Sequence, residues 1–227
     1  MKFKLINTAL SLFTLIAVAQ FPDKHFKSEE NIHYWKNKKP YEGYWQQDVH
    51  YTIYAKLNDS TNIISGKLKL EYTNNSPDNL PFVFFNLYNN AQAKGSYLSD
   101  LYKNNGRRPW YGKYQKDSLG TNISSISLNG KLLQTEQDNT VQKVYLPEPI
   151  KSGESVSFEI EFTTYFDYGA IRNRMKMFNS WGYKHYDVVH WYPRIAVYDR
   201  KFGWNTDQHL DREFYGDFGT YDVAFTL

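Results

Sequence analysis

The chain has 227 residues, of which 27 are Lys or Arg and 24 are Asp or Glu. Two of the lysines, Lys2 and Lys4, lie in a predicted signal peptide, and without them the count is 25 basic against 24 acidic residues. A chain this close to neutral has no electrostatic footprint for nucleic acid. Cysteine is absent, which excludes disulfides, thiolate metal sites and cysteine nucleophiles, and the 18% of aromatic residues suffices for a packed core and excludes disorder of the whole chain.

The N-terminus has the features of an export signal. Lys2 and Lys4 precede a mostly apolar stretch, and Ala17-Val18-Ala19 supplies the small residues that a signal peptidase reads. We predict a helical signal peptide over residues 1–19, with a buried N-terminal helix as the alternative. No segment is long and apolar enough to span a bilayer, and there is no cysteine to carry a lipid. The expectation is an exported protein, periplasmic or extracellular, without a stable membrane anchor.

The pattern changes sharply after the first forty residues. Residues 20–44 mix lysines and aromatic residues without a period, which favours an extended lead-in to a β-domain over residues 45–227. Residues 49–57 and 64–72 alternate apolar and polar side chains around a turn cluster, which predicts a hairpin. Gly66 is a candidate β-bulge.

The rest of the chain also predicts strands, over residues 82–88, 141–146, 156–162 and 221–227. The first is apolar on both faces, as in a central strand, and the second is expected to stop at Pro147. Asn129-Gly130 between apolar runs predicts a hairpin turn, and residues 91–121 lack a period and predict a long loop. The fold class is therefore all-β, an antiparallel β-sandwich or a large curved, saddle-like sheet.

No catalytic constellation is present. His185 and His190 flank Asp187, but their spacing puts the two imidazoles on opposite faces of a strand, so a polar strand edge is favoured over a zinc site. Glu159 and Glu161 are expected on a solvent face rather than as an acid and base pair. We assign no catalytic residue, no metal ligand and no cofactor to this chain.

Two aromatic segments are candidates for binding. Residues 107–111, Arg-Arg-Pro-Trp-Tyr, have the composition of a sugar or phosphate site, although a loop with its aromatic rings turned inward is favoured. The segment from His190 to Asp199 is more particular than a generic strand. Pro193 fixes one backbone dihedral and directs the preceding rings, and Asp199 can accept hydrogen bonds from nearby amides. We expect a rigid loop, with a buried aromatic turn as the alternative.

Several motifs along roughly residues 45–227 together resemble a known family. They are Tyr51-Thr52-Ile53 with Gly66-Lys67-Leu68 and Tyr72-Thr73-Asn74-Asn75, then Phe84-Phe85-Asn86-Leu87-Tyr88, Leu128-Asn129-Gly130, Leu146-Pro147, Gly153-Glu154-Ser155-Val156, Trp191-Tyr192-Pro193 to Asp199, and Phe214-Tyr215-Gly216-Asp217-Phe218-Gly219 followed by Tyr221-Asp222-Val223. In their order and spacing they resemble the N-terminal domain of aminopeptidase N-like zinc metallopeptidases, the gluzincins.

The resemblance implies a non-catalytic β-domain that docks on a C-terminal catalytic domain acting on peptide substrates. That domain would hold the zinc, because this chain lacks the H-E-x-x-H motif and the G-x-M-E-N loop of the family; the expectation is a chain truncated before the zinc site. By the same resemblance, the substrate-cleft rim is formed by His190, Trp191, Tyr192, Pro193 and Asp199.

Two other functions stay open. One is a free-standing secreted β-sandwich that binds carbohydrate or protein through exposed aromatic rings. Burial of Trp191, Tyr192 and Trp204 would disfavour it. The other is a purely structural sandwich.

Overall fold

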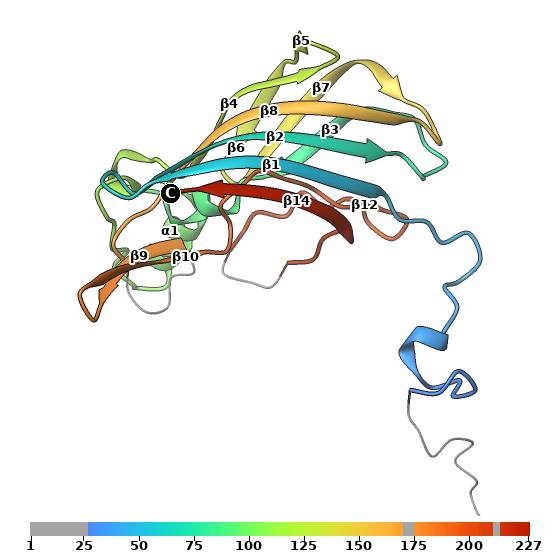
Figure 1. Ribbon diagram of the computed structural model, residues 1–227, viewed down its shortest axis with the longest axis horizontal. Coiled ribbons are helices and arrows are strands. Elements are labelled where there is room, and N and C mark those ends of the chain that lie inside the picture. Colours follow the sequence, from blue (N-terminus) through green and yellow to red (C-terminus); the bar gives the residue numbers. More distant parts are fainter. Residues whose placement is uncertain (1–26, 170–174, 211–213) are drawn as a thin grey trace, which may run out of the picture. The chain divides into compact units, whose positions relative to one another are not determined.

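The computed structural model describes residues 27–169, 175–210 and 214–227 (Figure 1). The chain divides into two compact units, one ending at Tyr44 and one from Trp45 to Leu227. In the first unit the described residues form turns and the 3-10 helix η1 (Trp35–Asn37), and the side-chain amide of Asn37 donates to the carbonyls of Ser28 and Asn31. The predicted signal peptide lies outside the described residues.

Six strands of the second unit form the larger sheet. Their order is β14 (Gly219–Thr226), β1 (Asp48–Asn58), β2 (Ile63–Thr73), β8 (Ser155–Tyr165), β4 (Thr121–Leu128) and β5 (Lys131–Leu132). All neighbours are antiparallel except β14, which runs parallel to β1 at the edge. The long strands curve together (Figure 1).

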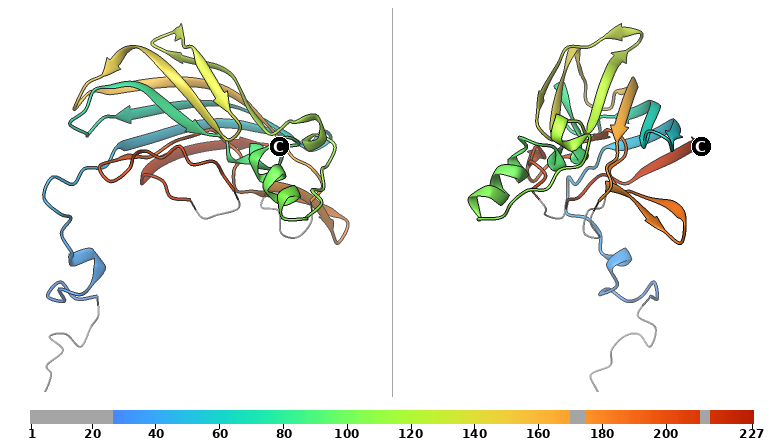
Figure 2. Two further views of the ribbon diagram at one scale, coloured as in Figure 1. Left: turned by 180° about the vertical axis from the view of Figure 1, so that it is seen from behind. Right: turned by 90° about the vertical axis from the view of Figure 1, so that its left-hand side faces the viewer.

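A smaller sheet and two ribbons complete the strands. The smaller sheet has the order β11 (Arg194–Ile195), β3 (Leu80–Asn86), β7 (Val141–Ile150) and β6 (Thr135–Asp138), and all its pairs are antiparallel. The ribbons pair β9 (Met175–Ser180) with β10 (Tyr183–Val188), and β12 (Tyr198–Asp199) with β13 (Gly203–Trp204). Figure 2 shows the two sheets lying against each other.

One apolar core fills the space between the two sheets. Alternate residues of β1 and β2 face it, as the two-residue period predicted, and the ring of Phe85 on β3 meets the ring of Phe158 on β8 edge to face at 6.0 Å. Burying these side chains contributes about 1.5–3 kcal/mol each. The prediction of an all-β, antiparallel sandwich is confirmed.

The hairpin turn at Asn129-Gly130 is also confirmed. Both residues have positive φ, 51° and 74°, as a two-residue turn of type I′ requires, and they connect β4 to β5.

Gly66 is not a β-bulge, because the pairing of β2 with β1 and with β8 continues without a shift through this residue. Its role is steric. A Cβ atom at Gly66 would lie 2.4 Å from Cζ of the buried Phe162 ring. Glycine is present because the aromatic ring of the neighbouring strand occupies the space of a side chain.

The strand predicted to stop at Pro147 continues to Ile150. Between Leu80 and Phe82 on β3 the register shifts, so that residues 146–149 of β7 bulge opposite a single residue. β6 pairs with residues 141–144 of β7 and not with the residues that follow. Pro147 and Pro149 therefore lie where the strand needs no ladder hydrogen bond on that side.

The predicted loop over residues 91–121 contains the helix α1 (Tyr97–Asn104) and the 3-10 helix η3 (Gln115–Asp117). Its first two residues belong to the 3-10 helix η2 (Tyr88–Gln92). The hydroxyl of Ser96 caps α1 by accepting from the amide of Ser99 at 3.1 Å. An eight-residue helix is too short to show a clear period, which is why the sequence pattern missed it. Within the described residues, no helix has the length and apolar character needed to cross a membrane.

Candidate functional site

The predicted rim segment lies where the edge strands of both sheets meet. After β10 the chain passes through residues 189–193 and enters β11, which pairs with β3 at the edge of the smaller sheet. Rings from this segment contact β14 and β1 of the larger sheet. The segment therefore lines the open side of the sandwich, between β11 and β14.

Trp191 and Tyr192 turn inward toward the larger sheet. The Trp191 ring lies 5.7 Å from that of Phe225 on β14 and 6.1 Å from that of Phe162. The Tyr192 ring meets that of Tyr51 on β1 at 5.6 Å. Burial is the largest cause that raises the pKa of the Tyr192 hydroxyl well above its usual range. Both side chains are partly buried and pack on the core, so they are neither free platforms nor fully internal.

Pro193 is buried, and the backbone that follows it is fixed from the larger sheet. The buried hydroxyl of Tyr51 accepts a hydrogen bond from the amide of Ile195 at 3.0 Å. The Tyr51 ring also stacks on that of Tyr221, at 4.9 Å and with the planes 3° apart. A single buried tyrosine thus joins the rim segment, β1 and β14.

His190 lies in different surroundings from the rest of the rim segment. Its imidazole packs edge to face against Tyr88 at 5.2 Å, His209 at 5.3 Å and Phe214 at 4.9 Å, measured between ring centroids. Its backbone amide donates to the sulfur of Met175 at 2.8 Å. The structure places His190 in an aromatic cluster with His209, a residue that the sequence pattern did not single out.

Asp199 closes the turn of the β12–β13 ribbon. Its Oδ1 accepts from the amides of Lys201 at 2.9 Å and Phe202 at 2.8 Å, as expected for this carboxylate, and both bonds are exposed. Its Oδ2 accepts from the hydroxyl of Tyr215 at 3.0 Å, and burial, together with this bond, raises the pKa of Tyr215 to about 12. The structure thus ties the end of the rim segment to the chain just before β14.

Arg194, Gly216 and Asp217 also lie together in this region, which the sequence pattern did not indicate. A Cβ atom at Gly216 would lie 1.6 Å from Nη2 of Arg194, so glycine is needed for the guanidinium to lie there. Burial raises the pKa of Asp217 to about 6, opposed by a hydrogen bond from Gln46 and by the charge of Arg194. Among the described residues, no side chain or amide donates to Oδ2 of Asp217, which is buried.

The core-facing side of β14 is an apolar surface that is only half covered. Tyr221, Val223 and Phe225 lie beside Tyr51, Ile53 and Ala55 of β1 in register and share their face. The residues on β1 are buried, whereas the three on β14 are 42%, 50% and 44% exposed. The core of the sandwich thus continues to its edge and ends there uncovered by the residues described.

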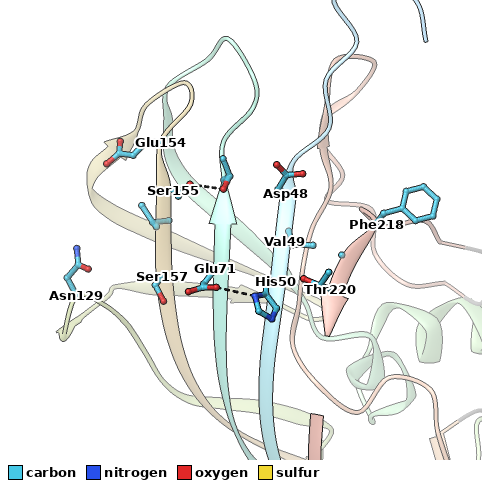
Figure 3. Close-up of a pocket in the computed structure, with 13 residues that line it drawn as sticks. Asp48, Val49, His50, Glu71, Asn129, Glu154, Ser155, Ser157, Phe218 and Thr220 are labelled. Carbon is cyan, nitrogen blue, oxygen red and sulfur yellow. Dashed lines mark hydrogen bonds and ion pairs between the residues drawn. The ribbon is translucent and has the colours of Figure 1, made fainter. Parts of the chain in front are cut away.

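A groove of about 910 Å³ lies on the opposite face of the larger sheet (Figure 3). Asp48, His50, Glu71 and Phe218 are among its lining residues. His50 points toward Glu71 in the close-up. Its Nδ1 lies 3.2 Å from Oε2 of Glu71, and its Nε2 lies 2.8 Å from Oδ2 of Asp222 on β14.

The other candidate residues take separate positions. His185 stacks on Phe178 in the β9–β10 ribbon, and His190 lies beyond the end of that ribbon. Within the described ranges, no group of three or more His, Cys, Asp or Glu side chains is placed to hold a metal ion. Glu159 and Glu161 are on the solvent face, as predicted, and Glu161 pairs with Lys67 at 2.8 Å.

The expectation that the loop over residues 107–111 turns its aromatic rings inward is wrong for Trp110, which is 65% exposed. Tyr111 is partly buried and its hydroxyl is hydrogen-bonded to that of Ser99 on α1. The helix α1 thus holds one of the two rings of this loop, and the other is in solvent.

Comparisons with known proteins give similar structures but no similar sequence. No protein-family model matches the chain, and no curated protein sequence matches it. Similar solved structures include the M1 zinc metallopeptidase from Deinococcus radiodurans, with 17% identity over 60% of this chain and 25% of that chain and a TM-score of 0.38. A two-domain M1 zinc metallopeptidase mutant bound to L-tryptophan has 18% identity over 62% and 26% of the two chains, also with a TM-score of 0.38. The chain spans about a quarter of the length of these structures.

Proposed function

We propose that residues 45–227 form the non-catalytic N-terminal β-domain of an exported zinc metallopeptidase of the aminopeptidase type. The observation that carries the proposal is the half-covered apolar face of β14, at the edge where the aromatic rim segment also lies. This is the position at which the motif resemblance puts the boundary with a catalytic domain. The expected partner is that domain, and the expected substrate of the complete protein is a peptide.

The physical basis is the placement of apolar surface on an edge strand. Tyr221, Val223 and Phe225 form one row, and Trp191 and Tyr192 pack behind it. The described residues leave the outer edge of β14 without a pairing strand. A contiguous apolar row at such an edge favours association with another domain, because core surface and backbone groups are both left without cover. A catalytic domain docked there would cover the row and place the rim segment beside the cleft.

In this proposal the zinc belongs to the catalytic domain, where it would polarise the scissile carbonyl and activate water. None of the described residues is assigned to hold it. The task of this chain is positional: Tyr51 holds the amide of Ile195, and Asp199 closes the turn, so that the Trp191 and Tyr192 rings stay in place.

Export is a separate part of the proposal and rests on the order of charged, apolar and small residues over residues 1–19. The expected mature N-terminus is Gln20. Amino-terminal sequencing of the protein recovered from the periplasm or the medium tests it, and an intact Met1 in a protein that stays in the cytoplasm contradicts it.

The docking role is tested in the complete protein with a matched pair of variants. Phe225→Ser removes apolar surface from the row, whereas Tyr54→Ser removes an exposed ring from the opposite face of β1. We expect Phe225→Ser to lower the turnover of aminoacyl substrates and the joint unfolding temperature of the two domains, and Tyr54→Ser to change neither. Equal behaviour of the two variants contradicts docking on β14.

A binding module is the second candidate, and one observation favours it. Trp181 lies at the turn between β9 and β10 with a positive φ of 51°, and its side chain is 94% exposed. Tyr183 beside it is 74% exposed. Such rings can stack on sugars. Binding of a soluble glycan that is lost in Trp181→Ala and kept in Trp191→Phe would favour this function over the peptidase domain.

A further inference from the structure

Among the described residues, the edge strand β14 pairs with one neighbour, β1, along eight residues. Its core-facing side chains contact Tyr51, Trp191 and Tyr192 and are half exposed. In the described part of the chain, the one ion pair that reaches β14 comes from His50, which is 2.8 Å from Asp222. The same imidazole is 3.2 Å from Glu71 on β2. His50 therefore lies at the centre of a cross-strand bridge from β14 through β1 to β2.

The geometry of this bridge requires a particular protonation state. Ionised carboxylates only accept hydrogen bonds, and both ring nitrogens of His50 face a carboxylate oxygen. A neutral imidazole has one N–H and can donate to only one of them, whereas an imidazolium donates to both. Loss of the proton would turn one of the two contacts into a repulsion between lone pairs.

We propose that His50 is a pH-sensitive clamp that strengthens the attachment of the edge strand β14 to the sheet when the imidazole is protonated, so that the strand opens more often when the proton is lost. The inference concerns the attachment of β14 and does not rest on the proposed function. Opening of the strand would uncover Tyr51, Ile53 and Ala55 of β1.

The groups that face His50 on the outer side of the sheet favour its cationic form. On β1 they are Asp48 and Thr52, on β2 they are Lys69, Glu71 and Thr73, on β14 they are Thr220 and Asp222, and beyond β2 they are Ser157 and Glu159 of β8. Lys69, the one cation among them, is itself paired with Glu71 at 2.8 Å. The hydrogen bond with Asp222 is the largest cause that raises the pKa of His50 above its ordinary 6.5.

The sign of the pH dependence follows from these shifts. The pKa of His50 is raised while β14 is paired with β1. The clamp is therefore fully present below the ordinary histidine value of 6.5 and is lost as pH rises through the raised value. Lys69 is the largest cause that lowers the pKa of Glu71, with His50 adding to it, so this partner stays ionised at and somewhat below its ordinary 4.5. The clamp is therefore strongest between these two ordinary values.

Amide hydrogen exchange of the full chain from pH 5 to pH 8 tests the proposal. The quantity measured is the protection of the β14 amides divided by that of the β8 amides, each corrected for its intrinsic rate, so that global unfolding cancels. We expect this ratio to fall as pH rises, by about tenfold for each unit by which the NMR-measured pKa of His50 exceeds that in Asp222→Asn. In His50→Gln the ratio should be low and independent of pH.

The matched control is His185→Gln, which removes a histidine of the β9–β10 ribbon and should keep the wild-type pH profile. If His50→Gln fails to fold, Asp222→Asn gives the decisive profile, since Asp222 is a highly exposed surface side chain. A wild-type ratio that is flat from pH 5 to pH 8 would overturn the proposal. So would a decline that persists unchanged in both His50→Gln and Asp222→Asn.

Discussion

Asp217 is the carboxylate of the rim region whose environment is least suited to a charge. It is partly buried, its Oδ2 has no donor among the described residues, and Arg194 and Gln46 only partly offset the burial, so its pKa is raised to about 6. A carboxyl with a raised pKa in the folded state is tolerated while protonated, below its ordinary 3.8, and reduces stability as pH rises through about 6.

We therefore predict that Asp217→Asn stabilises the chain at pH 7.5 by about 1–2 kcal/mol and leaves its stability at pH 3.5 unchanged. Urea unfolding of the variant and the wild type at both pH values measures the difference. A variant that is less stable than the wild type at pH 7.5 would show that the ionised carboxylate is needed as a partner of Arg194.

Gly66 provides a second prediction at the level of one residue. Gly66→Ala places a Cβ atom 2.4 Å from the Phe162 ring, which is buried and has little room to move, and should reduce the free energy of unfolding by about 1–3 kcal/mol. The same substitution in a Phe162→Leu background should cost less, because the ring that it meets is gone. Additive losses in this double-mutant cycle would mean that the contact with Phe162 is not the cause.

Single residues were predictable from the sequence when their partners lie close along the chain. The bonds from Asp199 to the amides of Lys201 and Phe202 span two and three residues, and an aspartate in a turn commonly makes them. The environment of Asp217 depends on Arg194 and Gln46, which are far away in sequence, so no local pattern indicates it. The role of Gly66 was missed for the same reason, since Phe162 lies on another strand.

Among the structural elements, the alternation of apolar and polar side chains predicted the strands but not all of their ends or pairing partners. The hairpin of β1 and β2 and the turn at Asn129-Gly130 follow from local periods and turn residues. The parallel pairing of β14 with β1 joins residues about 170 positions apart, and the extension of β7 through two prolines depends on a bulge opposite β3. Neither leaves a local signal.

The β12–β13 ribbon is the element through which Asp199 acts. Asp199→Ala removes acceptors for two amides and for the Tyr215 hydroxyl; since these bonds are exposed, we expect a loss of about 1 kcal/mol. Asp199→Asn keeps an oxygen for the two amides and should lose less. Urea unfolding and the exchange of the Lys201 and Phe202 amides measure both effects. Equal stability of the alanine and asparagine variants contradicts this account of the turn.

At the scale of the whole β-domain, the exposed row on β14 should decide how the purified chain behaves. Tyr221, Val223 and Phe225 form a continuous apolar surface with the rim aromatic rings behind it. Such surfaces bind hydrophobic dyes and promote association. We predict that Phe225→Thr lowers dye binding and light scattering with little change in stability, while Tyr54→Thr, on the opposite face, changes neither. Equal dye binding by both variants would mean that the dye binds to a surface other than the row on β14.

We propose that this β-domain serves a zinc peptidase. The most direct measurement is the mass and zinc content of the protein that the native cell exports, captured with an antibody against residues 45–227. We expect a polypeptide with a further domain, about one zinc ion per chain and hydrolysis of aminoacyl substrates that a chelator abolishes. An exported protein that consists of residues 20–227 alone and contains no zinc would contradict it.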